Sequence, residues 1–259
     1  MQTSPSFPST PAPAGGAARS AGLRRLVTDA PTRMFHWLFA LSFLGAYLTA
    51  EGERWRMLHV TLGYTMAGLL VFRVLYGLMG PRQAGLGLMW RKLSGLPAWL
   101  ASLRKARSLS DVPWRQGQNL LMALAVVALL ALVVPLTLTG YATFNDWGDV
   151  LGGEALEALH EFLGNTLLLV VLAHVALVIG LSLLRRKNQA LPMLTGRLPG
   201  PGPDLVKHNR VWLAWLLLAA VLAYGGWEWQ QSPRGLVPTG AFVGDAPGHI
   251  DHHHDDDGD

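Results

Sequence analysis

The chain of 259 residues contains no cysteine. Disulfides, cysteine-ligated zinc, iron–sulfur clusters and covalently attached c-type haem all need thiols, so the sequence excludes each of them. Charged residues are also scarce, at 15%, whereas an ordinary soluble domain has about 25%. Hydrophobic residues make up 51% of the chain, and its mean hydropathy is +0.28. So few charges cannot cover a wetted surface, and we therefore expect an all-α integral membrane protein.

Five long apolar stretches carry this prediction. Leu120–Leu138 and Thr166–Leu184, for example, contain no Asp, Glu, Lys or Arg. A helix of about 20 residues crosses the ~30 Å hydrocarbon core, and a backbone in lipid must satisfy its own hydrogen bonds. The first helix is expected to begin at Thr28 or Asp29, with Pro31 in its first turn. The predicted spans are residues 31–50, 57–79, 118–140, 156–184 and 211–229.

The remaining charges separate by sign. Lys and Arg concentrate in the N-terminal arm and in segments 80–117 and 185–210, while the alternate connections are acidic or nearly neutral. The positive-inside rule then predicts a multi-pass protein of the bacterial inner membrane, with a cytoplasmic N-terminus and a periplasmic C-terminus. The net charge of +4 divides into about +14 inside and −11 outside, with Arg73 inside the membrane. This distribution argues against a nucleic-acid partner. Leu86–Leu103 is predicted to form a short amphipathic helix on the inner surface.

The pattern divides the chain into four regions. Residues 1–23, rich in Ser, Pro, Ala and Gly, are expected to form a disordered cytoplasmic arm. Residues 24–188 contain the first four spans, and residues 189–230 contain a linker and the fifth. Residues 231–259 are expected to form a disordered exocytoplasmic tail rich in His and Asp. This tail could hold a metal ion loosely, dock a basic partner, or be only a solvated acidic segment.

Histidines inside the spans give the main functional signal. These are His36, His59, His160 and His174. A titratable side chain in a span is costly and indicates function, although any single histidine could instead be a hydrogen bond between helices. His160 and His174 are 14 residues apart, which is about 21 Å along a helix and about 40° around it. In the predicted topology His36 shares a depth with His174, and His59 with His160. Two facing imidazoles can ligate a haem iron from both axial sides.

Small residues near these histidines fit a flat cofactor. Gly63 and Gly68 follow His59, and Gly164 follows His160. A macrocycle between helices needs such missing side chains, but ordinary helix packing uses them equally. The glycines are therefore compatible with the haem hypothesis without deciding it.

Arginines near the spans are candidate partners for haem propionates. Arg33 and Arg73 are placed to serve the haem nearer the cytoplasm, and Arg54 and Arg56 the other. For Arg33 an interaction with lipid phosphate is the alternative.

Four local sequences resemble one known family. DAPTRMFHW (29–37), RMLHVTLGY (56–64), FRVLYGLMGPR (72–82) and HEFLGNTLLLVVLAHV (160–175) are similar to runs in the bacterial cytochrome b561 and Ni/Fe-hydrogenase b-type cytochrome family. The resemblance covers about residues 24–188. It implies a four-helix membrane core that holds two non-covalent b haems. Carried over by motif, the axial ligands would be His36 with His174 and His59 with His160, which agrees with the pairing by depth.

The resemblance also implies electron exchange between membrane quinone and an exocytoplasmic redox protein, such as a hydrogenase, a c-type cytochrome or a dehydrogenase. The chain would then be an electron-transfer subunit of a quinone-linked complex. Two alternatives remain: a histidine-lined transporter of metal ions or protons, and a membrane anchor for a soluble redox complex. The transporter predicts acidic groups along a path inside the spans, and the spans have them only near their ends, as Glu161 does in the fourth. The resemblance ends before the fifth span and gives that helix no role.

Overall fold

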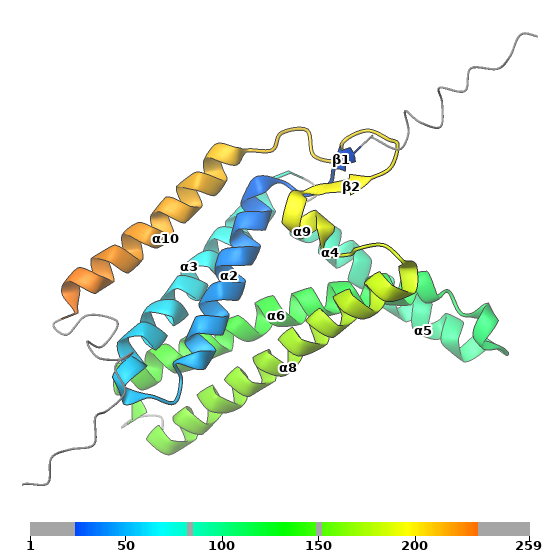
Figure 1. Ribbon diagram of the computed structural model, residues 1–259. Helices are drawn as coiled ribbons and strands as arrows, with labels where there is room; N and C mark the ends of the chain where they lie inside the picture. The colour runs from blue at the N-terminus through cyan, green and yellow to red at the C-terminus, as the bar shows by residue number, and fades with distance from the viewer. Residues whose placement is uncertain (1–23, 82–84, 149–151, 233–259) are drawn as a thin grey trace, which may run out of the picture.

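The computed structural model describes residues 24–81, 85–148 and 152–232. Within these ranges the chain is almost entirely helical, with one small two-stranded sheet (Figure 1). The predicted N-terminal arm and nearly all of the predicted His/Asp tail lie outside the described residues. The all-α prediction is confirmed.

Each of the five predicted spans is a helix. Four of them, α3, α6, α8 and α10, are long and apolar enough to cross a membrane. The remaining helix, α2, does not reach that apolarity because its 19 residues include Arg33 and His36, so its membrane-spanning role stays a prediction. The bounds are Ala30–Leu48 for α2, Arg56–Met79 for α3, Trp114–Phe144 for α6, Gly153–Arg185 for α8 and Val211–Gln231 for α10.

The start of α2 agrees with the sequence prediction. The Asp29 carboxylate caps the helix by accepting a hydrogen bond from the Thr32 amide at 3.3 Å, and Pro31 lies in the first turn. Asp29 is only 2% exposed. Its second carboxylate oxygen accepts a hydrogen bond from the Tyr76 hydroxyl of α3. One carboxylate therefore caps α2 and joins it to α3.

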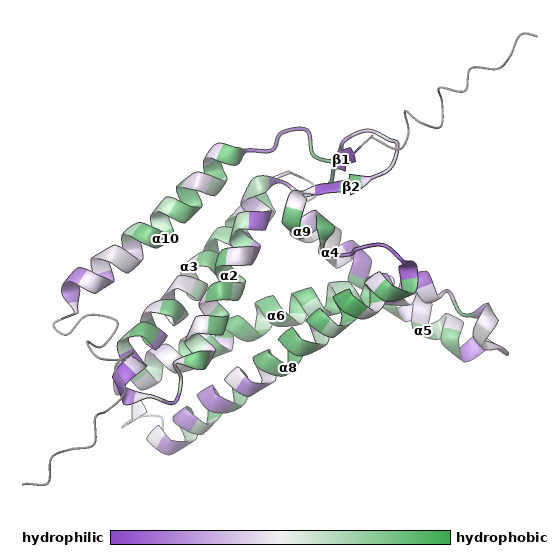
Figure 2. Ribbon diagram, in the orientation of Figure 1, coloured by the Kyte–Doolittle hydropathy of each residue, from purple (hydrophilic) through white to green (hydrophobic). Residues whose placement is uncertain are grey.

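The first four spans form two helix pairs, α2 with α3 and α6 with α8, and α10 lies beside α2. α2 packs against α3 and α10, α6 packs against α8, and α3 contacts α6. In Figure 1 the two pairs lie close together where α2 ends and α8 begins, and they diverge toward the end where α2 begins. Figure 2 shows apolar residues along the middle of α6 and α8, with hydrophilic residues gathered near helix ends. This distribution suits helices that pass through hydrocarbon and end at polar interfaces.

A central apolar layer joins α2, α3, α6 and α8. It consists of Phe43, Met66, Val133 and Leu167, which pack together, one from each helix. Their exposed fractions are 8%, 2%, 0% and 1%. The layer is the most deeply buried part of the four-helix core.

A small sheet closes the end where α2 begins. β1 (Arg24–Leu26) pairs antiparallel with β2 (Arg197–Pro199), which follows the short helix α9 (Leu191–Thr195). Two hydrogen bonds from backbone amides to side chains hold this end together. The Asp204 carboxylate accepts from the Leu26 amide at 2.6 Å, and the Asn209 side-chain oxygen accepts from the Ala30 amide at 2.9 Å. We call β1, α9, β2 and the segment through Asn209 the clasp. The sequence prediction did not include it.

The predicted helix over Leu86–Leu103 is two helices, α4 (Leu86–Leu93) and α5 (Leu96–Lys105). Gly95 caps the second helix and Pro97 lies in its first turn, where proline's missing N–H does no harm. Trp99 of α5 packs directly on Gly117 of α6. The prediction of one continuous helix is therefore wrong, because this Gly and Pro end one helix and start the next.

Candidate functional site

The central apolar layer separates the four histidines into two levels. On α8 the layer residue Leu167 lies seven residues from both His160 and His174, about 10.5 Å in either direction. The layer residues of α2 and α3 follow His36 and His59, also by seven positions. Because α2 runs opposite to α3 and α8, His59 and His160 share one level, and His36 and His174 share the other. Packing thus gives the same grouping as the predicted topology.

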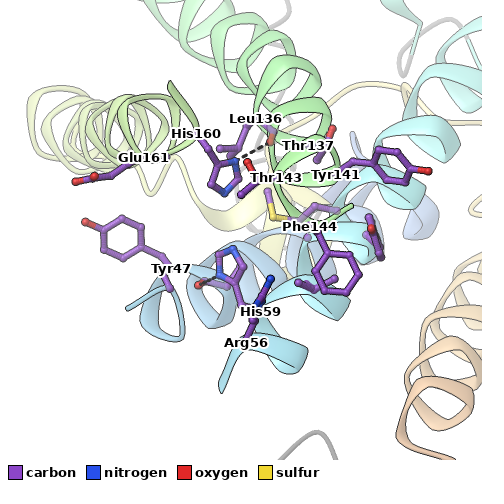
Figure 3. A pocket seen from close by; sticks show the side chains of 18 of the residues that line it. Tyr47, Arg56, His59, Leu136, Thr137, Tyr141, Thr143, Phe144, His160 and Glu161 are labelled. Carbon is purple, nitrogen blue, oxygen red and sulfur yellow. Dashed lines mark hydrogen bonds between the residues drawn. The ribbon is translucent and has the colours of Figure 1, made fainter. Parts of the chain in front are cut away.

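The His59–His160 level brings two imidazoles close together across the cavity (Figure 3). Their ring centroids are 6.1 Å apart with an interplanar angle of 80°, and Figure 3 shows them on opposite sides of the cavity. A metal bound to an imidazole nitrogen lies about 2 Å from it, and the ring centre lies about 1 Å further, so one metal between two rings separates their centres by roughly 6 Å. The observed separation fits a single axially ligated iron.

Backbone carbonyls of neighbouring helices orient both rings. His59 Nδ1 lies 2.8 Å from the Ala46 carbonyl oxygen of α2, and His160 Nδ1 lies 3.1 Å from that of Leu136 on α6. A carbonyl oxygen can only accept, so each Nδ1 carries the proton and donates. The Thr139 hydroxyl also lies 3.1 Å from His160 Nδ1, but it can donate its own proton to a backbone carbonyl of α6 and accept from the ring. The tautomer leaves Nε2 of each ring with a free lone pair, as an axial ligand requires.

A cavity of about 470 Å³ surrounds this pair (Figure 3). Gly63 and Gly164 line it, as expected for glycines that make room for a macrocycle, and a Cβ on Gly63 would meet no atom within 4 Å. Gly68 does not line the cavity. Gly140 of α6 was missed by sequence reasoning, yet a Cβ there would lie 2.8 Å from Cε1 of His160. Its only sequence signal is a glycine near the end of an apolar span.

Aromatic side chains form one side of the cavity. Tyr64 of α3 contacts Tyr141 and Phe144 of α6, with ring centroids 6.3 and 6.4 Å apart. The Arg56 guanidinium lies 5.8 Å from the Phe144 ring centroid. Arg56 therefore borders the cavity, as its suggested propionate role requires, whereas Arg54 is not among the lining residues.

The His36–His174 level is more open. The two histidines lie near enough to interact electrostatically, but no ring contact joins them among the described residues. Both Nδ1 atoms are buried without a hydrogen-bond partner, and His36 packs edge-on against Trp37 with centroids 5.3 Å apart. The difference from the other pair follows from the divergence of the two helix pairs at this end (Figure 1). Unlike the first pair, these two imidazoles have no backbone carbonyl in the described part of the chain that holds Nδ1.

The two arginines predicted for this level have different surroundings. Arg73 is 8% exposed and interacts electrostatically with the buried Asp29. It borders a second cavity, of about 450 Å³, together with Thr32, one turn before His36. Arg33 is half-buried, with Nη1 3.5 Å from the Leu194 carbonyl of α9. The sequence indicated both arginines but not the Asp29 carboxylate that faces Arg73.

An apolar helical bundle with facing imidazoles in its interior, and with no cysteine to anchor a haem, defines a membrane protein of the b-type cytochrome class. Comparison with known families matches residues 27–196 to the prokaryotic cytochrome b561 family, and the chain belongs to that family. The resemblance found in the sequence is thereby confirmed. No curated protein and no solved structure matches the chain. The protein is a membrane cytochrome, and its family indicates electron transfer through b-type haem.

Proposed function

We propose that this cytochrome holds two b haems and carries electrons between membrane quinone and a redox protein on the exocytoplasmic side. His59 and His160 would bind one haem, and His36 and His174 the other. The observation that carries the proposal is the first pair: two rings 6.1 Å apart, each with Nδ1 held by a backbone carbonyl.

Haem iron supplies the one-electron chemistry, and the chain sets its surroundings. Donation from Nδ1 to a carbonyl fixes ring orientation and raises the basicity of Nε2. Held by two histidines, a haem would have no open position for oxygen, and its chemistry would be electron transfer. Arg56 borders the first cavity, and Arg73 and Arg33 lie at the second level, where guanidinium groups can pair with propionates.

Two histidine levels suit transfer across the bilayer. His160 and His174 are 14 residues apart on α8, about 21 Å along the helix axis. Redox centres held at these levels would divide the hydrocarbon core into shorter steps. With a cytoplasmic N-terminus and a periplasmic C-terminus, the His59–His160 level would face the exocytoplasmic partner, a hydrogenase, c-type cytochrome or dehydrogenase.

The test is the haem content of the purified full-length protein. We expect a b-type α band after dithionite reduction and two haems per chain by the pyridine haemochrome method. His160→Ala and His174→Ala should each remove one haem, and the double variant both. His208→Ala is the matched control, because this exposed histidine lies outside the predicted spans. A wild-type protein with one haem per chain, or single variants that keep two, would refute the assignment.

The quinone part of the proposal has its own measurement. Protein in liposomes should be reduced by a short-chain quinol without dithionite, and His36→Ala should slow this reduction if the second level receives the electrons. An intact two-haem protein that no quinol reduces would contradict the quinone role and leave the haem assignment standing.

A further inference from the structure

Two cavities enter the four-helix core from opposite ends. The first, beside His59 and His160, reaches Phe43 and Met66 of the central apolar layer. The second cavity lies at the clasp end. Of the α6 residues that line it, Val126 is the nearest to the layer along the helix. Val126 precedes the layer residue Val133 by seven positions, about 10.5 Å of helix. The layer therefore lies between the two cavities.

Both cavities are polar enough to admit water or charged groups. Glu157 and Glu161 border the first, and Asp29, Arg73 and Lys92 border the second. Any haem propionates held beside arginines would add further charge. A continuous polar path between these cavities would let protons cross, because a chain of hydrogen-bonded groups suffices to relay them.

The central apolar layer interrupts such a path. Its four side chains carry no hydrogen-bonding N or O atom and are at most 8% exposed. Nearby hydroxyls are satisfied by their own helices: Thr65 donates to the Thr61 carbonyl and Thr137 to the Val133 carbonyl, each at 2.8 Å. A buried water needs about two to four polar partners, and the four side chains of the layer offer none.

We propose that Phe43, Met66, Val133 and Leu167 form a proton barrier, through which electrons pass between the two histidine levels while protons and ions do not. Electron transfer needs no bonded path of mobile protons, whereas proton transfer does. The inference rests on the proposed transmembrane electron transfer, because only a protein with redox groups on both sides of the layer needs this separation. The same layer argues against the transporter alternative.

The experiment compares polar and apolar substitutions of similar size. Full-length wild-type and variant proteins are reconstituted into liposomes that contain a pH-sensitive dye, and passive proton entry is followed after a pH jump with the membrane potential clamped by valinomycin and potassium. The polar variants are Leu167→Asn and Met66→Gln, which nearly keep the number of side-chain heavy atoms. Their controls are Leu167→Ala and Met66→Leu. An apolar void left by alanine stays dry, so it should remain tight to protons.

We expect wild type and both apolar controls to match protein-free liposomes, and each polar variant to raise proton entry several-fold. Haem spectra recorded on the same samples separate the two proposals. If wild type shows no b-type spectrum, the proposed function fails, while its proton flux still reports on the barrier. The barrier is refuted if wild type itself leaks, or if the polar variants are as tight as their controls. Should Leu167→Asn fail to assemble, Met66→Gln decides the question alone, because its unbranched side chain keeps the original length.

Discussion

Substitution of Gly140 by alanine adds one methyl group beside a single ligand. The new Cβ would lie 2.8 Å from Cε1 and 3.3 Å from Nδ1 of His160, whereas carbon atoms in contact are about 3.5–4.0 Å apart. The ring must therefore move by roughly 1 Å. Its hydrogen bond to the Leu136 carbonyl, already 3.1 Å long, would be lost or strongly bent.

The expected magnitude follows from the role of that hydrogen bond. Loss of a partner that orients a metal-bound histidine weakens binding by about 10- to 100-fold, which corresponds to roughly 1.4–2.8 kcal/mol. Gly140→Ala should therefore lower haem occupancy at the His59–His160 level and shift the midpoint potential of that haem alone. A haem held at the His36–His174 level, two helix turns beyond the layer, should keep its potential.

The assay is a redox titration followed at the α band, with haem per chain measured on the same sample. Gly68→Ala is the control, because a Cβ there meets no atom within 4 Å and the position does not line the cavity. If Gly140→Ala and Gly68→Ala gave equal haem content and equal potentials, the placement of His160 against Gly140 would not govern the site and the reasoning would be wrong.

Two further predictions concern the clasp end. Tyr76→Phe removes the hydroxyl that donates to the buried Asp29 carboxylate, so thermal unfolding should show a loss of about 1–3 kcal/mol; an unchanged Tm would contradict the structural role of this bond. Gly196→Ala places a side chain where φ is +76° and a Cβ would lie 2.7 Å from the Thr28 carbonyl. The left-handed conformation alone costs about 1–2 kcal/mol, so the Val27 amide, which donates to Gly196, should exchange its hydrogen faster. Equal exchange in wild type and variant would show that the clasp tolerates the change.

Much of the helical architecture could be predicted because a helix that crosses hydrocarbon needs about 20 predominantly apolar residues in a row. The N-cap of α2 at Asp29 and the position of α10 agree with the predictions made from the sequence. The bounds of α6 differ most, since the apolar window covers 118–140 while backbone hydrogen bonds continue from Trp114 to Phe144. Hydropathy locates the lipid-facing part of a helix and does not locate its last hydrogen bond.

The parts that could not be predicted depend on contacts between distant segments. β1 and β2 have three residues each, too few for an alternating pattern to distinguish them from a loop. His59 and His160 have the same depth in the predicted topology, and this indicated that they lie close together. The wider separation of His36 and His174 could not be predicted, because it depends on how the helix pairs diverge. Gly140 looks like any packing glycine until the imidazole beside it is known.

The clasp also bears on the order in which the protein is built. α2 leaves the ribosome before the later part of the clasp, yet the Ala30 amide at its start is bonded to Asn209, and the Leu26 amide of β1 to Asp204, partners 179 and 178 residues later in the chain. The start of α2 therefore cannot reach its final state until α8 and the whole clasp have been synthesised. His36 lies two turns inside that helix, so the second histidine level is completed late. This level can then be completed only after Asn209 has been synthesised, and a product truncated before that residue would leave it unfinished.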